Sequence, residues 1–236
     1  MKAIILAGGK GTRLAPYTKI LPKPLVPIGD MPILEVMIHQ LKRSGVDEIT
    51  LTVGHLANLL RAFFSDGSRY GIKIEYSYEE KPLGTVGPLS LLPRPTEAFF
   101  VTNGDVLTTQ DLHALYASHL ASGAIATIAT HQRHIKIELG VIQFNDHKRV
   151  TSYTEKPVLD YAASMGIYVF DPRIIDYIPP KQNFDFPNLV QVLLAHGEKV
   201  QAFPFRGYWQ DLGNPMDYEQ AVKDFESMRV EFLGEE

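Results

Sequence analysis

The sequence predicts an α/β fold with three layers, in which helices cover a mostly parallel central sheet. The chain has 236 residues, enough to bury the core of one large domain without disulfides. Strands and helical patterns alternate through its first half, which is typical of a parallel sheet. The predicted strands are short apolar runs at residues 3–7, 49–53, 72–76, 99–102 and 125–129.

The clearest helix in the sequence covers residues 33–44. Leu34, Met37 and Leu41 fall on one face of it, and Gly45 is placed to end it. In a mostly parallel sheet, ligands collect at the carboxyl ends of the strands. The glycine-rich stretch after residues 3–7 and the polar residues after 99–102 should therefore converge.

The second half of the chain, from about residue 137, has a different pattern. Its strands look shorter and more antiparallel, and its helices are expected near the end. We interpret it as a lobe that completes a cleft on residues 1–136, within a single domain of residues 1–236. The elements expected here are strands at 140–144, 150–153, 164–170 and 200–205 and helices at 188–195 and 215–228.

The composition excludes several classes of protein. A formal charge of -4, with 21% charged and 45% hydrophobic residues, argues against a surface that binds nucleic acid. The absence of cysteine excludes a disulfide scaffold, a thiolate nucleophile and cysteine-ligated zinc. No signal peptide and no apolar run of about 18 residues is present, so we expect no membrane partner and a cytoplasmic protein.

The most informative motif is the glycine-rich stretch Gly8-Gly9-Lys10-Gly11-Thr12-Arg13. Such a turn after a buried strand frees backbone N–H groups to face an anion, and Arg13 and Lys23 add positive charge. A dinucleotide-binding motif would need glycine where Leu14 stands, and a P-loop would need Gly-Lys-Ser/Thr. A tight turn without a ligand is the alternative, which the added cations disfavour. The motif therefore predicts a polyphosphate site.

A family resemblance extends from this motif along nearly the whole chain. The sequence resembles the sugar-1-phosphate nucleotidyltransferases, closest in motif to the mannose- and heptose-1-phosphate guanylyltransferases. The motifs that carry the resemblance occur in the expected order. They are residues 6–14, Pro22-Lys-Pro-Leu25, Leu83-Gly-Thr85, Asn103-Gly-Asp105, Glu155-Lys-Pro157, residues 166–170 and Trp209-Gln-Asp-Leu-Gly213.

The resemblance implies a Rossmann-like, GT-A-like fold and an enzyme. Its reaction would join a nucleoside triphosphate to a sugar-1-phosphate and release pyrophosphate, with Mg²⁺ as cofactor. Residues 1–136 would bind the nucleotide and residues 137–236 the sugar phosphate, without the C-terminal β-helix domain of some relatives. Family members are often oligomers, so a homo-oligomer is a further expectation.

The resemblance also assigns the charged residues. Arg13 would hold the departing phosphates, and Lys23 would stabilise the transition state. Asp105 and Asp211 would bind Mg²⁺, and Lys156 would hold the phosphate of the sugar. Taken singly, these motifs are also typical of ordinary turns and solvated loops. A nucleotide-sugar sensor that binds without catalysis is the competing function, but a sensor need not keep this complete charged set.

Nucleotide binding is assigned to a larger set: Leu6, Ala7, Gly8, Gly9, Gly11, Thr12, Glu79, Gly84, Thr85 and Asn103. Glu79 stands where the family reads the base. A carboxylate only accepts hydrogen bonds, which suits the N1–H and N2–H₂ edge of guanine and suits uracil or thymine less fully. We therefore favour GTP, with a uridylyl- or thymidylyltransferase as the alternative. Glu79 and Glu80 could also be ordinary surface charges.

For the sugar, the resemblance implicates Gly140 and Glu155 beside Lys156. Most relatives have asparagine two positions before the motif that starts at Gly166, where this chain has Ser164. Serine offers one short hydroxyl in place of an amide, so this contact would be lost, water-mediated or suited to another sugar.

Overall fold

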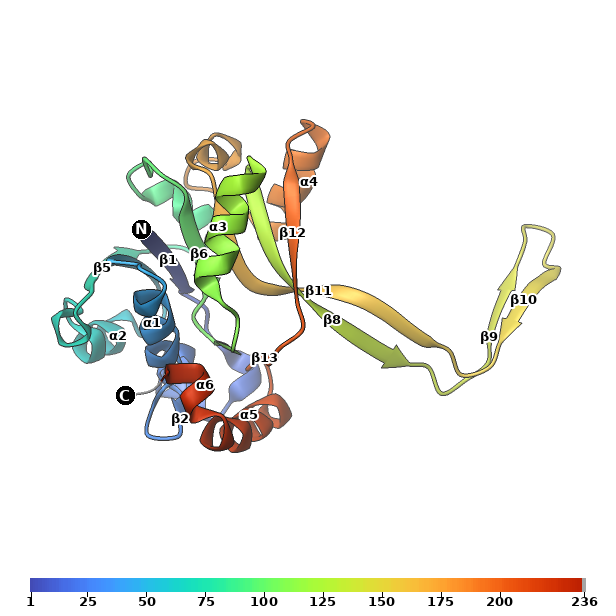
Figure 1. The fold of residues 1–236 in the computed structure, drawn as a ribbon, viewed down its shortest axis with the longest axis horizontal. Coiled ribbons are helices and arrows are strands. Elements are labelled where there is room, and N and C mark those ends of the chain that lie inside the picture. Colours follow the sequence, from blue (N-terminus) through green and yellow to red (C-terminus); the bar gives the residue numbers. More distant parts are fainter. Residues whose placement is uncertain (235–236) are drawn as a thin grey trace.

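The computed structural model describes residues 1–234, and its centre is a seven-stranded sheet with the strand order β12-β8-β11-β6-β1-β4-β5 (Figure 1). Only β11 runs antiparallel to its neighbours, which confirms the mostly parallel α/β fold. In chain order the strands are β1 Lys2–Ala7, β4 Glu48–Val53, β5 Lys73–Tyr78, β6 Phe99–Asn103, β8 Ala126–Lys136, β11 Val158–Phe170 and β12 Val200–Phe205.

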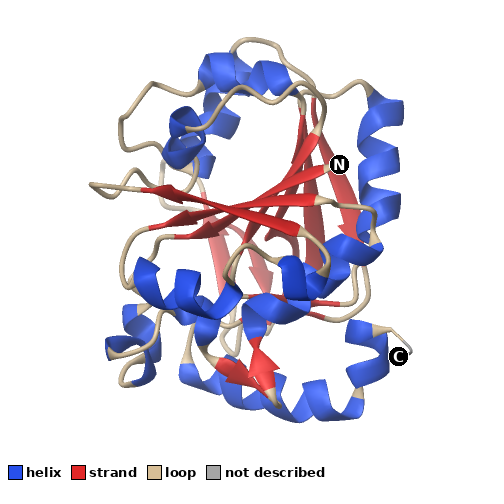
Figure 2. Cartoon of the chain, turned by 90° about the vertical axis from the view of Figure 1, so that its left-hand side faces the viewer, coloured by secondary structure: helices blue, strands red, loops and turns tan. Residues whose placement is uncertain are grey.

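Helices cover both faces of the sheet (Figure 2). One face packs against α1 (Ile33–Arg43), α2 (Ala57–Phe64) and α3 (Leu112–Ser122). The other face packs against α4 (Phe186–Ala195) and two 3-10 turns, Gly87–Leu91 and Pro172–Tyr177. Buried on both sides, the central strands need the continuous apolar runs that the sequence shows. None of the helices within residues 1–234 is long and apolar enough to span a bilayer.

A third apolar cluster fixes the C-terminal part of the chain beside the sheet edge. Helices α5 (Pro215–Ser227) and α6 (Arg229–Leu233) pack there against α1 and the short strands β2 (Pro27–Ile28) and β3 (Met31–Pro32). Just before α5, β13 (Trp209–Asp211) pairs with β7 (Val106–Thr108). This pairing sets Asp211 opposite Val106, and the Leu212 amide donates to the Asp105 carbonyl at 3.2 Å. The two aspartates are thereby neighbours.

Residues 131–163 leave the rest of the molecule as a long two-stranded arm (Figure 1). The outer parts of β8 and β11 form its inner ladder, and β9 (Val141–Phe144) and β10 (Val150–Thr154) form its outer ladder. We call the remaining residues the body. We expected the segment from residue 137 onward to form a lobe. Its first part, residues 137–163, forms part of the arm instead. Residues 131–136 and 158–163 contain no apolar run, so the sequence pattern did not show that both strands continue.

Candidate active site

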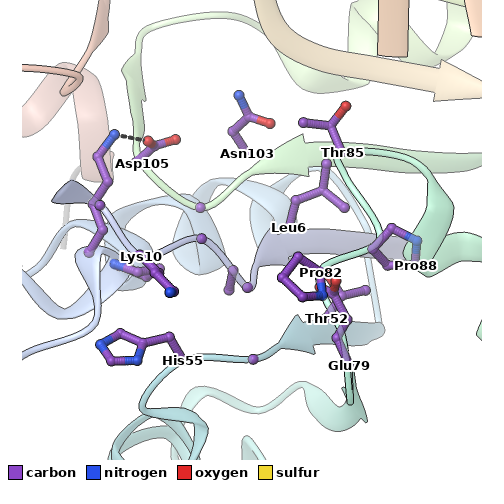
Figure 3. A pocket seen from close by; sticks show the side chains of 18 of the residues that line it. Leu6, Lys10, Thr52, His55, Glu79, Pro82, Thr85, Pro88, Asn103 and Asp105 are labelled. Carbon is purple, nitrogen blue, oxygen red and sulfur yellow. Dashed lines mark hydrogen bonds and ion pairs between the residues drawn. The ribbon is translucent and has the colours of Figure 1, made fainter. Parts of the chain in front are cut away.

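A pocket of about 860 Å³ lies at the carboxyl ends of β1, β4, β5 and β6, a volume in the range of small-molecule sites (Figure 3). The loops that follow these strands form most of its wall. The structure brings together in this pocket all the residues that the sequence assigned to the nucleotide and to catalysis. These are Leu6, Ala7, Gly8, Gly9, Gly11, Thr12, Arg13, Lys23, Glu79, Gly84, Thr85, Asn103 and Asp105. Asp211, assigned to the metal, does not line the pocket.

The glycine-rich loop turns tightly at Gly11, which has a φ of +60°. A Cβ atom at Gly11 would lie 2.9 Å from Thr18 Cγ2 and 3.0 Å from Lys23 Cβ. The Gly11 carbonyl accepts hydrogen bonds from the Leu14 amide (3.0 Å) and the Thr18 hydroxyl (2.7 Å). Glycine is therefore required here by both backbone and packing, and the turn carries Thr12 and Arg13 into the pocket.

Lys23 connects the two aspartates at one end of the pocket. Its Nζ donates to the Asp105 carboxylate, the dashed contact in Figure 3, and lies 3.8 Å from Asp211 Oδ1. Arg13 lies near Asp211, since Arg13 Nη1 and Asp211 Oδ2 are 3.4 Å and 3.3 Å from the position of a Cβ on Gly213. Partial burial and the nearby Asp105 carboxylate raise the pKa of Asp211, and Lys23 and Arg13 oppose this shift.

The two carboxylates fit the ligand set of a hard divalent cation. Both approach the single Lys23 ammonium, and Asp105 raises the pKa of Asp211, so their negative charges converge on one region. Within residues 1–234, no cluster of three or more histidine or carboxylate side chains is arranged to hold a metal. A metal here would therefore take its remaining ligands from phosphate and water oxygens, as Mg²⁺ does at many nucleotide sites.

Glu79 lies at the opposite end of the pocket, beside Thr52 and Pro82 (Figure 3). Its Oε2 accepts the Leu83 amide at 3.0 Å, and its Oε1 lies 2.4 Å from where a Cβ on Gly8 would stand. Burial raises the pKa of Glu79, and the Leu83 amide partly offsets that effect. Glu79 is thus a half-buried carboxylate in direct contact with the glycine loop, and not an exposed surface charge.

The loop after Glu79 is tied to the start of α4. The Thr85 amide donates to Asp185 Oδ1 (2.9 Å), and the Thr85 hydroxyl accepts from the Phe186 amide (2.7 Å). Gly84 has a φ of +79°, and a Cβ there would lie 2.7 Å from the same Asp185 oxygen. These contacts hold Gly84 and Thr85 at the pocket wall.

The residues assigned to the sugar lie elsewhere. Gly140, Glu155 and Lys156 lie between the two ladders of the arm, and none of them lines the pocket of its own chain (Figure 1). They are close to one another: the Tyr153 hydroxyl donates to Glu155 Oε2 at 2.7 Å, and a Cβ at Gly140 would collide with that hydroxyl. The structure therefore groups these residues but does not bring them to the nucleotide side of the same chain.

Ser164 lies where the arm joins the body. Its hydroxyl hydrogen-bonds to the Tyr168 hydroxyl at 3.2 Å, and it pairs with Thr130 across the ladder. It does not line the pocket, but nearby Gly166 contacts Asn103, since a Cβ there would lie 2.6 Å from Asn103 Nδ2. The segment around Ser164 thus supports a pocket residue from behind.

Some pocket residues were missed by sequence reasoning. Gly54 and His55 follow β4, whose carboxyl end lies beside that of β1, so strand order alone could have indicated them. His55 had been given no role, yet it lies beside Lys10 at the pocket rim (Figure 3). The other pocket residues without an assigned role are Lys10, Pro24, Thr52, Glu80, Pro82, Pro88, Gly104 and Gly213.

Comparison with known proteins supports a common origin for this fold and pocket. The chain is 36% identical over 250 residues to a UTP–glucose-1-phosphate uridylyltransferase of Synechocystis, a match that covers 98% of this chain and 64% of the relative. It is 35% identical to a mannose-1-phosphate guanyltransferase of Schizosaccharomyces pombe, covering 92% of this chain and 62% of the relative. The chain thus spans less than two thirds of the length of these relatives.

A solved structure and a family model agree with these matches. The crystal structure of HddC from Yersinia pseudotuberculosis, complexed with GMP-PN, aligns with a TM-score of 0.71 and 25% identity over 95% of this chain and 99% of that one. The family model described as nucleotidyl transferase matches residues 2–228. The chain belongs to the nucleotidyl transferase family.

Proposed function

We propose that this chain transfers a nucleotidyl group from a nucleoside triphosphate to a sugar-1-phosphate and releases pyrophosphate. The observation that carries the proposal is the pocket itself. The turn at Gly11, with Arg13 and Lys23, lies at the same end as the paired carboxylates Asp105 and Asp211, while Glu79 lies at the other end beside Gly8. This polarity matches a nucleotide, whose phosphates and base lie at opposite ends.

The reaction requires two anions to approach each other. A phosphate oxygen of the sugar-1-phosphate attacks the α-phosphorus, the bond from that phosphorus to the bridging oxygen breaks, and pyrophosphate leaves with the electron pair. Two unit charges about 4 Å apart repel by about 4 kcal/mol at an effective dielectric of 20, so fixed cations are needed. Arg13 and Lys23 would supply them on the nucleotide. No general base is required, because the attacking phosphate is already largely ionised at pH 7.

We further propose Mg²⁺ as the cofactor, held by Asp105 and Asp211. The two carboxylates and the phosphate oxygens are all negatively charged and repel one another. A bound Mg²⁺ would neutralise this charge. In the free protein Lys23 occupies the Asp105 carboxylate. Binding of the cation and the triphosphate would release Lys23 from that ion pair toward the reacting phosphates.

We favour GTP as the nucleotide. Glu79 presents a half-buried carboxylate, which can accept two hydrogen bonds from the N1–H and N2–H₂ groups of guanine but only one from N3–H of uracil or thymine. The guanyltransferase relative and the neighbour bound to GMP-PN also favour guanine. A uridylyltransferase is the second candidate, because the Synechocystis relative bears that name at similar identity.

The test is pyrophosphate release with Mg²⁺ over a grid of GTP, UTP, dTTP, CTP and ATP against mannose-, glucose-, N-acetylglucosamine- and heptose-1-phosphates. Turnover with GTP and one of these sugars is expected, and its loss on addition of EDTA would support the metal. Turnover with UTP or dTTP alone would overturn the choice of base. If no pair of substrates releases pyrophosphate although nucleotide still binds, the proposed activity is overturned.

Glu79→Gln tests the base assignment on its own. An amide offers one acceptor and one donor, so it cannot accept both guanine N–H groups. The ratio of kcat/KM for GTP to that for UTP should fall by about tenfold or more, the scale of one good hydrogen bond. Glu80→Gln, one residue further along the pocket wall, is the matched control and should leave this ratio unchanged.

A further inference from the structure

The arm has one mainly apolar face that stays largely exposed and is not covered by any other part of residues 1–234. Along the inner ladder, directly opposed residues share a face. Ile135, Leu159 and Tyr161 lie on one side together with Arg133, while His134, Lys136, Val158 and Asp160 lie on the other. The apolar three are 44–52% exposed, whereas His134 Nδ1 hydrogen-bonds to Asp160 Oδ1 on the polar side. This alternation is typical of a sheet with one buried face and one solvated face.

The outer ladder repeats the same division. Ile142 pairs with Tyr153 and Phe144 pairs with Val150, which places these four side chains on one face, while Gln143 and Ser152 pair on the other. The apolar four are 50–66% exposed. An isolated two-stranded ribbon is marginally stable in water, so ribbons of this length are normally packed against something. A contiguous exposed apolar face of this kind marks an interaction surface.

The base of the arm is held firmly to the body. His131 Nε2 donates to the Gly207 carbonyl (3.0 Å), and the Arg133 guanidinium lies 4.8 Å from the centre of the Trp209 ring. Trp209 in turn donates to the Met165 carbonyl (3.0 Å), and β12 pairs with β8 as far as His131. Swinging the arm about its base toward its own pocket would break these contacts. The direction of the arm is therefore set by the body.

The segment between the two ladders, residues 137–140 and 155–157, is here called the elbow. It holds Gly140, Glu155 and Lys156 together, with Lys156 in a left-handed conformation at a φ of +44°. Lysine rarely adopts this conformation without a structural or functional demand. The elbow therefore presents a cation and a carboxylate beside a glycine, far out on the arm.

The pocket of the same chain lacks cations on the side away from its glycine loop. Within residues 1–234, the lysine and arginine side chains that line it are Lys10, Arg13 and Lys23, all from one segment after β1. If the proposed function holds, these serve the triphosphate, and the anionic second substrate has no cation of its own. The site is incomplete without a further positive charge.

We propose that two copies of this chain exchange arms, so that the apolar face of each arm packs on the partner and its elbow supplies Lys156 to the partner's sugar-phosphate site. We choose a second copy of this chain as the partner because the arm extends from the same edge of the sheet at which the pocket opens. β8 runs parallel to β6, so the arm departs from the carboxyl edge where the pocket opens. Two copies facing each other across that edge, related by a two-fold axis, would each place an arm over the other's pocket.

The first test is independent of activity. The chain contains no cysteine, so a chain carrying both Lys10→Cys and Lys156→Cys has only these two thiols. Because a two-fold exchange closes on itself, oxidation should give dimers, and no larger species, on a non-reducing gel. A disulfide within one chain would show that the arm folds back, and no disulfide would show that the elbow reaches no pocket; either result overturns the proposal. Lys10→Cys with Lys148→Cys, at the arm tip, is the control and should link far less.

The second test rests on the proposed function and uses two impaired variants. Asp105→Asn disables the pocket and Lys156→Ala disables the arm. At a sugar-phosphate concentration well below the wild-type KM, the first alone should be nearly inactive and the second alone should keep about a tenth of wild-type activity or less. Mixed and re-associated at equal amounts, they should recover about a quarter of wild-type activity, because half the dimers are mixed and each has one intact site. No recovery would overturn the exchange. If the wild-type chain has no activity on any pair of substrates, the proposed function fails, and the disulfide test still decides the arm.

Discussion

The body and the arm are built from the same kind of strand but differ in what surrounds them. In the body, β1, β4 and β6 lie between helices, and Ile5, Leu51 and Val101 have no accessible surface. The antiparallel β8–β11 ladder begins in the body and continues into the arm, where its apolar side chains are about half exposed. The body buries its own apolar surface and can organise a site within one chain. The arm does not, so its apolar side chains must be buried against another surface.

The largest effect is expected in the body, from Asp105→Asn. The substitution keeps the size of the side chain but removes the charge that pairs with Lys23 and that would hold Mg²⁺. Turnover should fall by a factor of about 100 or more, the range seen when a single charge-stabilising group is lost. Pyrophosphate release is the measurement, with Asp146→Asn at the arm tip as control. Turnover within a few-fold of wild type would remove Asp105 from the metal site.

On the arm, Ile142→Asp and Gln143→Asp form a matched pair on opposite faces of β9. A charge at position 142 would have to be buried in the proposed interface, whereas one at position 143 would stay in solvent. We expect the first to weaken dimerisation by about tenfold or more, since an unpaired buried charge costs several kcal/mol. The second should have little effect. Sedimentation equilibrium compares them, and equal association constants would contradict the orientation of the arm.

A smaller effect should separate two glycines of similar backbone conformation. Gly11 (φ +60°) in the pocket loop and Gly123 (φ +64°) after α3 both cost about 1 kcal/mol to replace by alanine on backbone grounds alone. Only at Gly11 would the new Cβ also collide with Thr18 and Lys23, whereas Gly123 has open space. Gly11→Ala should therefore lose more thermal stability and also raise the KM for nucleotide. Equal melting temperatures and equal KM values would show that the loop adapts freely.

The smallest effect concerns the pH dependence of nucleotide binding. Burial raises the pKa of Glu79 above its ordinary value of 4.5, so its carboxylate is protonated at a higher pH than an exposed glutamate. Because the raised pKa favours the neutral form in the folded state, its stabilising contribution is present below the unfolded pKa and is lost as pH rises through the folded pKa. Guanine recognition needs the ionised form and should weaken as pH falls. Glu79→Gln should flatten this KM profile, and identical profiles would exclude Glu79 as the group that titrates.

The predictability of the two regions differs for a physical reason. Strands 3–7, 49–53 and 99–102 were located closely because burial on both faces, or on most of one, demands apolar runs. The helix at residues 33–44 was located because its apolar face and Gly45 mark it, and it runs Ile33–Arg43 in the structure. The helices α2 and α3 were expected only as helical patterns, without bounds. In the arm, the strands expected at 140–144 and 150–153 are confirmed as the antiparallel pair β9 and β10. The continuation of β8 and β11 into the inner ladder and the direction of the arm were not predicted, because a partly exposed ribbon needs neither an apolar run nor a helical period.

The same contrast applies to the site. Residues that follow body strands, such as Gly8, Glu79 and Asp105, converge because the carboxyl ends of parallel strands share one edge. Gly140, Glu155 and Lys156 were assigned by family resemblance alone, and no local pattern could show that they lie on an arm. Whether they serve a pocket is a question about how chains associate.

The central claim is that the body binds the nucleotide and the elbow binds the sugar phosphate. The most direct test compares the kinetics of Lys156→Ala with those of Lys148→Ala. Both lysines lie on the arm in left-handed conformations, with φ of +44° and +62°, so replacement by alanine perturbs the backbone equally. We predict that Lys156→Ala raises the KM for sugar-1-phosphate by about tenfold or more, the worth of one charge-assisted hydrogen bond, and leaves the KM for nucleotide unchanged. Lys148→Ala should match wild type. A change confined to the nucleotide, or equal changes in both variants, would contradict the assignment of the sugar phosphate to the elbow.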